Sequence, residues 1–140
     1  MVSLRPHHPL CVLTYVGEGY GPDFVDNCDR IARRLAAGER VLVVDGPDDL
    51  CAPVLDRPGS HCRGARVDGR DARAAASVAS VLGREVAAGT VLDLGPPALR
   101  RLRAAFASGD ARHACDGCDW SGLCTAVAAR GFAGARVASA

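Results

Sequence analysis

The feature that most constrains this chain is a group of three cysteines near its C-terminus. Cys115, Cys118 and Cys124 are spaced C-x2-C-x5-C. A two-residue gap lets two thiolates turn toward one metal ion or cluster, and Gly117 allows the tight backbone path between them. The third cysteine follows one short loop later, where a helix can begin. Three clustered thiolates predict a metal site that takes its fourth ligand from elsewhere in the chain.

Four further cysteines are spread over the rest of the 140 residues, which makes seven in all. An odd number of cysteines, behind an N-terminus without the apolar stretch of a signal peptide, argues against a disulfide scaffold. It predicts a cytoplasmic protein whose thiols serve metal or redox chemistry. Cys28 falls on the apolar stripe of an expected helix, so we interpret it as a buried core thiol.

The missing ligand is expected from an irregular loop rich in proline and glycine, which carries Cys51 and Cys62. Cys11 and His8 are the alternates for this position. We therefore expect the metal to be held by four of five cysteines: Cys51, Cys62, Cys115, Cys118 and Cys124.

The spacing of these cysteines bears on which metal they hold. Structural zinc sites with four thiolates usually show two C-x2-C pairs, whereas Cys51 and Cys62 lie eleven positions apart. Iron–sulfur clusters accept a local group of three cysteines with a distant fourth. The pattern favours an iron–sulfur cluster, most simply of the 4Fe-4S type, with zinc as the alternative.

A second group of reactive side chains stands near the N-terminus. His8 and Cys11 are three positions apart and would share one face of a helix. The candidate pocket beside the metal consists of Arg5, His7, His8, Cys11, Tyr15 and Trp120. As a metal-dependent enzyme, the protein would use the two histidines for acid–base chemistry and Arg5 to anchor an anion. Alternatively, one histidine caps or hydrogen-bonds nearby backbone, the other is exposed, and Cys11 packs in the core. Trp120 would shield the metal from water.

Hydrophobic periodicity predicts an α+β fold that is mostly helical with a small sheet. Apolar residues make up 49% of the chain, enough for one hydrophobic core. The expected helices span residues 23–37, 69–82, 96–109 and 120–130, and residues 41–44 form a buried strand. We expect a single compact domain over 1–140, with its core at about 5–130, cysteine-rich loops joined by the metal, and residues 131–140 as a candidate disordered tail.

Charge and hydropathy narrow the possible partners. The chain has 17 basic and 16 acidic residues, a net charge of +1, so we expect no binding of nucleic acid. No segment reaches the roughly 18–20 apolar residues that cross a bilayer, so no membrane association is expected. The acidic residues Asp45, Asp48 and Asp49, next to Cys51, could bind a cation or cap turns, and we favour turns. The sequence does not identify a redox or protein partner.

Several short motifs resemble an uncharacterised family of small bacterial and archaeal proteins, the domain of unknown function DUF1284. The resemblance spans Arg5 to about Cys124 and rests on these stretches: Arg5-Pro6-His7-His8-Pro9-Leu10-Cys11, Gly19-Tyr20, Phe24-Val25, Asn27, Val44-Asp45-Gly46, Asp48-Asp49-Leu50-Cys51, Cys115, Cys118 and Trp120. It implies an iron–sulfur cluster held by cysteines and gives no activity. The family usually has Leu where Pro9 stands, and C-x-x-C-P in its middle loop. Here Val54 replaces the second cysteine of that loop, which leaves Cys62 as its other thiol.

Overall fold

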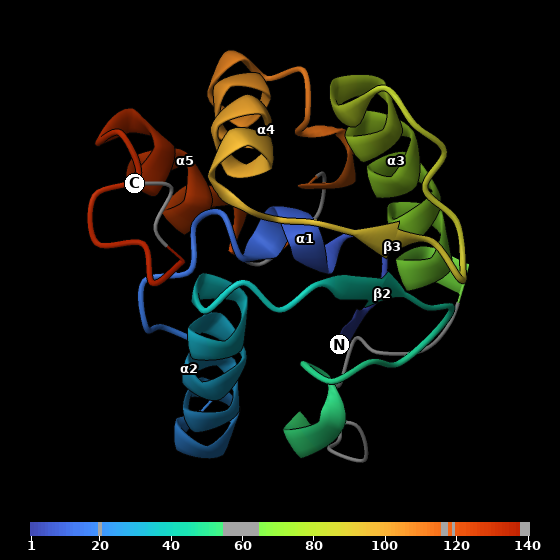
Figure 1. Cartoon of the computed structure of the whole chain (residues 1–140). Helices are drawn as coiled ribbons and strands as arrows, with labels where there is room; N and C mark the ends of the chain where they lie inside the picture. The colour runs from blue at the N-terminus through green and yellow to red at the C-terminus, as the bar shows by residue number, and fades with distance from the viewer. Residues whose placement is uncertain (20, 55–64, 116–117, 119, 138–140) are drawn as a thin grey trace.

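Three short strands form the sheet at the centre of this protein, in the order β1-β2-β3 (Figure 1). The computed structural model describes residues 1–19, 21–54, 65–115, 118 and 120–137. The strands are Val2–Leu4 (β1), Val41–Val43 (β2) and Val91–Leu92 (β3). β1 runs parallel to β2, with Val2 opposite Val41, and β3 runs antiparallel to β2. Both of these valines are fully buried, so this pairing is fixed by the core.

Two longer helices show how local sequence sets their ends. Helix α2 spans Pro22–Ala36 and helix α4 spans Pro96–Ser108. Each begins with a proline, whose fixed φ suits the first turn of a helix. α4 ends at Gly109, which adopts φ 93°, a left-handed conformation that favours glycine. Both helices bury an apolar face whose residues recur at three- and four-residue steps, and this burial supplies most of their stability.

The remaining elements carry or approach the cysteines. Helix α1 is a single turn, His8–Cys11, and helix α5 spans Ser121–Ala129. Helix α3 spans Ala65–Leu82. Two short 3-10 turns are η1, Ala52–Val54, and η2, His113–Cys115.

The helices surround the sheet and α1. Figure 1 shows α1 in the middle of the molecule, with α2 on one side and α4 and α5 on the other. α3 packs against both α4 and η2, and α4 packs against α5. Residues from all of these layers meet in one apolar core, which includes Leu4, Leu13, Leu92, Leu102 and Phe106. The N-terminal segment is thereby brought beside the C-terminal helices.

The expected α+β class, mostly helical with a small sheet in one compact domain, is confirmed. The strand at 41–44 and the helices near 23–37, 96–109 and 120–130 are found within a few residues of their expected bounds. α3 begins four residues before the expected position 69. Residues 131–137, part of the expected tail, form turns in which Val137 is buried. In the described part of the chain, no helix combines the length and apolar character that a membrane span requires.

Candidate metal centre

A cavity of about 310 Å³ lies where α1, α2, η2 and α5 meet. Six of the seven cysteines line it: Cys11, Cys28, Cys51, Cys115, Cys118 and Cys124. The expected pocket residues Arg5, His7, His8, Tyr15 and Trp120 line it as well. Cys62 lies outside the described residues. The cavity therefore gathers side chains that the sequence places more than a hundred positions apart.

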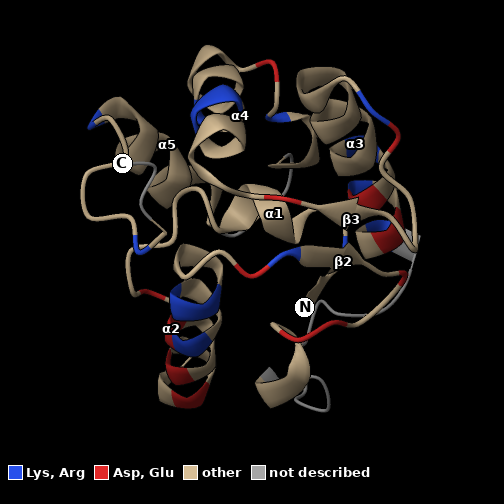
Figure 2. Ribbon diagram, viewed as in Figure 1, with Lys and Arg blue, Asp and Glu red and all other residues tan. Residues whose placement is uncertain are grey.

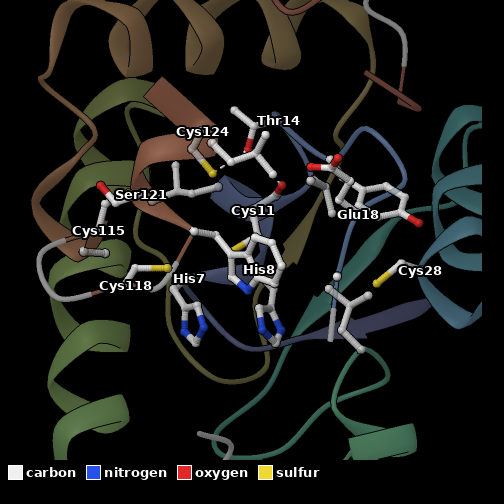
Figure 3. Close-up of a pocket in the computed structure, with 18 of the residues that line it drawn as sticks. His7, His8, Cys11, Thr14, Glu18, Cys28, Cys115, Cys118, Ser121 and Cys124 are labelled. Atoms are coloured by element: carbon white, nitrogen blue, oxygen red, sulfur yellow. Dashed lines mark hydrogen bonds between the residues drawn. The ribbon is translucent and has the colours of Figure 1, made fainter. Parts of the chain in front are cut away.

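Four of these thiols gather on one side of the cavity. Cys11 ends α1, Cys115 ends η2, Cys118 follows it and Cys124 lies on α5. Figure 3 shows the sulfur atoms of Cys11, Cys118 and Cys124 directed toward a shared space. We call Cys11, Cys115, Cys118 and Cys124 the thiol quartet. Backbone turns set its C-terminal part, because the Cys118 N–H donates to the Cys115 carbonyl at 3.0 Å.

Cys11 is exposed and lines the cavity. Burial raises the pKa of the Cys11 thiol well above its usual value, and the charges of Cys118, Cys124 and Cys115 raise it further. Cys115, Cys118 and Cys124 therefore lie within electrostatic reach of Cys11. Binding of a cation between them would remove the repulsion and favour the thiolate forms.

Cys124 is oriented by a neighbour of Cys11. The Thr14 hydroxyl donates a hydrogen bond to the Cys124 Sγ at 3.1 Å. Burial raises the pKa of the Cys124 thiol, while this hydrogen bond from Thr14 opposes the increase. A donor aimed at a sulfur is the kind of contact that supports a thiolate metal ligand and tunes its metal. Thr14 was not anticipated from the sequence, because only the fold brings residue 14 next to residue 124.

Cys28 stands apart from the quartet, on α2 across the cavity (Figure 3). It is 6% exposed and belongs to the hydrophobic core. Burial, followed by the charges of Asp29 and Asp48, raises the pKa of the Cys28 thiol to about 12. No thiol of the quartet contributes to this shift, so its surroundings match the core thiol expected from the sequence.

Cys51 belongs to a different group of polar side chains. Ligand atoms of His8, Asp48 and Cys51 all lie within 4.8 Å of one another, so these residues are a possible site for a metal ion. His8 Nδ1 lies 2.5 Å from Asp48 Oδ2, a hydrogen-bond distance. The other oxygen of Asp48 accepts the backbone N–H groups of Leu50 and Cys51, at 2.9 and 3.1 Å. Asp48 therefore caps the turn before η1, as the sequence suggested, and also orients His8.

Electrostatics hold Asp48 ionised in this buried position. Burial alone would raise the pKa of its carboxyl group. The charge of His8 and the hydrogen bonds from His8 and the Arg5 backbone outweigh burial and lower this pKa to about 2. With Nδ1 hydrogen-bonded to a carboxylate, the second ring nitrogen of His8 can serve as a metal ligand.

A parallel pair involves His7. Its Nδ1 lies 2.6 Å from Asp71 Oδ1, and the Arg5 guanidinium contacts Asp71 Oδ2 at 2.8–2.9 Å. Arg5 is completely buried, so Asp71 supplies its counter-charge inside the protein. Burial, and next the charge of His8, lower the pKa of His7 to about 4, although Asp71 opposes the shift. Arg5 thus has a carboxylate partner within the protein.

The two aromatic residues have separate surroundings. Tyr15 donates its hydroxyl to Asp29 at 2.8 Å and to the Val25 carbonyl at 3.1 Å, which ties the segment after α1 to α2. Trp120 precedes α5 and lines the cavity, next to the quartet in the chain. α1 and α5, the two helices that bear quartet cysteines, carry no Lys, Arg, Asp or Glu (Figure 2), and His8 is the one titratable residue besides the cysteines on these two helices. Apart from His8, charge at this site comes from neighbouring elements.

Comparison with known families identifies the chain's relatives. Residues 19–124 match the family model described as a protein of unknown function, DUF1284. The chain belongs to the DUF1284 family. The family description assigns no activity, and no match was found among curated proteins or among solved structures. In this DUF1284 protein the matched range contains three members of the quartet, whereas Cys11 precedes it.

The arrangement differs from the sequence expectation mainly in the origin of the fourth thiol. Cys115, Cys118 and Cys124 come together as their spacing suggested, and Cys11, named only as an alternate, joins them. Cys51 lines the same cavity among His8 and Asp48. Four soft thiols facing one hollow form a donor set suited to zinc or to an iron–sulfur cluster. The donors present thus fit a metal cofactor, whose type they leave to be established.

Proposed function

We propose that this protein binds an iron–sulfur cluster through the thiol quartet, with Cys11 as the distant fourth ligand. One observation carries the proposal: the four thiols line a single cavity. A cluster held by four cysteines, three local and one remote, matches this distribution along the chain. When bound, the cluster would supply one-electron redox chemistry, which suits electron transfer or redox sensing.

The spread of the sulfur atoms favours a cluster over a single ion at the quartet. In the described part of the chain, ligand atoms of His8, Asp48 and Cys51 form the group in which at least three potential ligands all lie within 4.8 Å of one another. The sulfur atoms of the thiol quartet do not form such a group, so they lie further apart than the ligand atoms of these three residues. Zinc bonds sulfur at about 2.3 Å, so its tetrahedral thiolates lie within about 4 Å of one another. A cluster places several iron ions between its ligands and needs wider spacing.

The direct test is the iron, zinc and acid-labile sulfide content of protein purified without oxygen, together with its visible spectrum. We expect iron with matching sulfide and a brown colour. A well-folded, colourless protein that contains zinc alone, or neither metal, would refute the cluster.

Serine substitutions identify the fourth ligand. Cys11→Ser is expected to lower iron and sulfide content severalfold, because a hydroxyl is a poorer ligand for iron than a thiolate. Cys28→Ser, a change of the same chemistry across the cavity, is the matched control and should leave the iron content near that of the wild type. Retained iron in Cys11→Ser together with its loss in Cys51→Ser would transfer the ligand role to the middle loop.

The second candidate function is binding of a single zinc ion at His8, Asp48 and Cys51. Their proximity favours it, since all three are residue types that bind zinc. Zinc there would have to replace the 2.5 Å contact between His8 and Asp48, because two ligands of one ion cannot approach so closely. Zinc content that falls in His8→Ala and is unchanged in Cys11→Ser would support this alternative.

A further inference from the structure

An arginine on α3 shares the cavity with the thiol quartet. Arg70 lines the cavity, and its Nε is buried without a hydrogen-bond partner. Within the described part of the chain, Arg70 makes no hydrogen bond or ion pair. A buried donor left unsatisfied is costly, so such a group needs a partner such as a bound water, ion or ligand.

The position of Arg70 follows from the packing of α3. Val67, Asp71, Ala74 and Val78 are buried and form the inner face of this helix. Arg70 lies at the edge of that face, three residues after Val67 and four before Ala74. α3 packs against η2, the turn that ends at Cys115. Arg70 and Cys115 thereby line the same cavity.

Two other charged side chains near the cavity, Asp71 and Arg112, already have partners within the protein. Asp71 pairs with Arg5 and His7, so it does not neutralise Arg70. Arg112 acts on Cys124, and its Nε is also buried without a partner. Its terminal nitrogens, however, donate to Ser121 and Thr125 at 3.1–3.3 Å. Arg112 therefore has a structural role at α5, and no such role is found for Arg70.

We propose that Arg70 donates hydrogen bonds to the sulfur atoms of the bound cluster and compensates its negative charge. This inference rests on the proposed function. A cluster with four thiolates is an anion, and reduction adds one more negative charge to it. A fixed guanidinium in a partly buried site stabilises the reduced form more than the oxidised form. Arg70 is thus a positioning and potential-setting residue, outside the ligand set.

The test is the reduction potential of the iron-loaded protein in three variants. Arg70→Gln removes the charge, Arg70→Lys keeps the charge but loses the planar donor group, and Arg73→Gln is the matched control. Arg73 lies one turn further along α3, is exposed, and donates to the His113 carbonyl at 3.2 Å. We expect Arg70→Gln to lower the ratio of reduced to oxidised protein about tenfold at a fixed potential. For a one-electron couple this corresponds to a fall of about 59 mV in the reduction potential. Arg70→Lys should recover part of this change and Arg73→Gln should show none.

The outcomes separate this inference from the function on which it rests. Wild-type protein without iron overturns both. Wild-type protein with iron, and an Arg70→Gln variant of equal iron content and unchanged potential, overturns the role of Arg70 alone. If Arg70→Gln folds but loses its iron, the iron content of Arg70→Lys decides between the explanations. Iron retained in Arg70→Lys supports charge compensation. Loss of iron in both variants would show that Arg70 acts through its shape, contrary to the proposal.

Discussion

At the scale of single residues, the most consequential interaction outside the thiol quartet is the buried pair of Arg5 and Asp71. The Arg5 side chain is 1% exposed and that of Asp71 12%. Removing one partner of a buried ion pair leaves the other charge without compensation, which costs about 3–5 kcal/mol. We therefore expect Asp71→Asn to lower the free energy of unfolding at pH 7 by about this amount, measured by urea denaturation of metal-free protein.

Asp68→Asn is the matched control for this substitution. Asp68 also approaches Arg5, at 3.7 Å, but its side chain is 70% exposed, so solvent screens the interaction. The Arg5 and His7 contacts lower the pKa of Asp71 below its ordinary value of 3.8, although burial acts in the opposite direction. The pair therefore contributes its full stability above pH 3.8, and this contribution disappears as the pH falls through the lowered pKa. Equal stabilities of the two variants at pH 7 would contradict the assigned pair.

At the scale of secondary structure, glycine residues offer a clear contrast between the ends of two helices. Gly109 follows α4 with φ 93°, which a residue with a Cβ adopts only at a cost of about 1–2 kcal/mol. Gly122 lies in the first turn of α5, its φ is not positive, and an added Cβ would meet no atom within 4 Å. We expect Gly109→Ala to lower the melting temperature and Gly122→Ala to leave it unchanged or raise it slightly, by circular dichroism. A reversed order would show that the end of α4 is wrongly assigned.

The helices could largely be predicted from the sequence, whereas two of the strands could not. α2 and α4 are predicted by a proline at the start, a glycine after the end and apolar residues at helical spacing. β1 and β3 contain three and two residues, too few to show any alternation. Both acquire their structure from pairing with β2. Long-range pairing of this kind is decided by the packed core rather than by local preference.

The same reasoning explains which part of the candidate site could be predicted from the sequence. Cys115 and Cys118 are close in the chain, so their spacing alone predicts that they meet. Cys11 reaches them only because α1 lies in the middle of the fold, between α2 and the C-terminal helices (Figure 1). Arg70 gave no signal in the sequence, since an arginine on a helix usually faces solvent. Such contacts are visible only in three dimensions.

At the scale of the whole molecule, the quartet would join the two ends of the chain. Cys11 lies between the core residues Leu10 and Val12 of the N-terminal segment, and Cys124 on α5 packs against the same core. A ligand that binds only the folded form stabilises it in proportion to the logarithm of its concentration over its dissociation constant. A metal centre at the quartet should therefore raise the stability of the entire domain, rather than that of one loop.

This coupling predicts how metal removal acts on wild-type protein and on a ligand variant. We expect removal of the metal to lower the wild-type melting temperature by several degrees and to speed proteolysis in the segments around residues 11 and 124, because both lose a shared anchor. Cys11→Ser should show little further change on metal removal, since its centre is already impaired. Cys28→Ser should respond like the wild type. An equal response of Cys11→Ser and the wild type would mean that the metal stabilises this fold without Cys11, and that the N-terminal segment is held by the hydrophobic core alone.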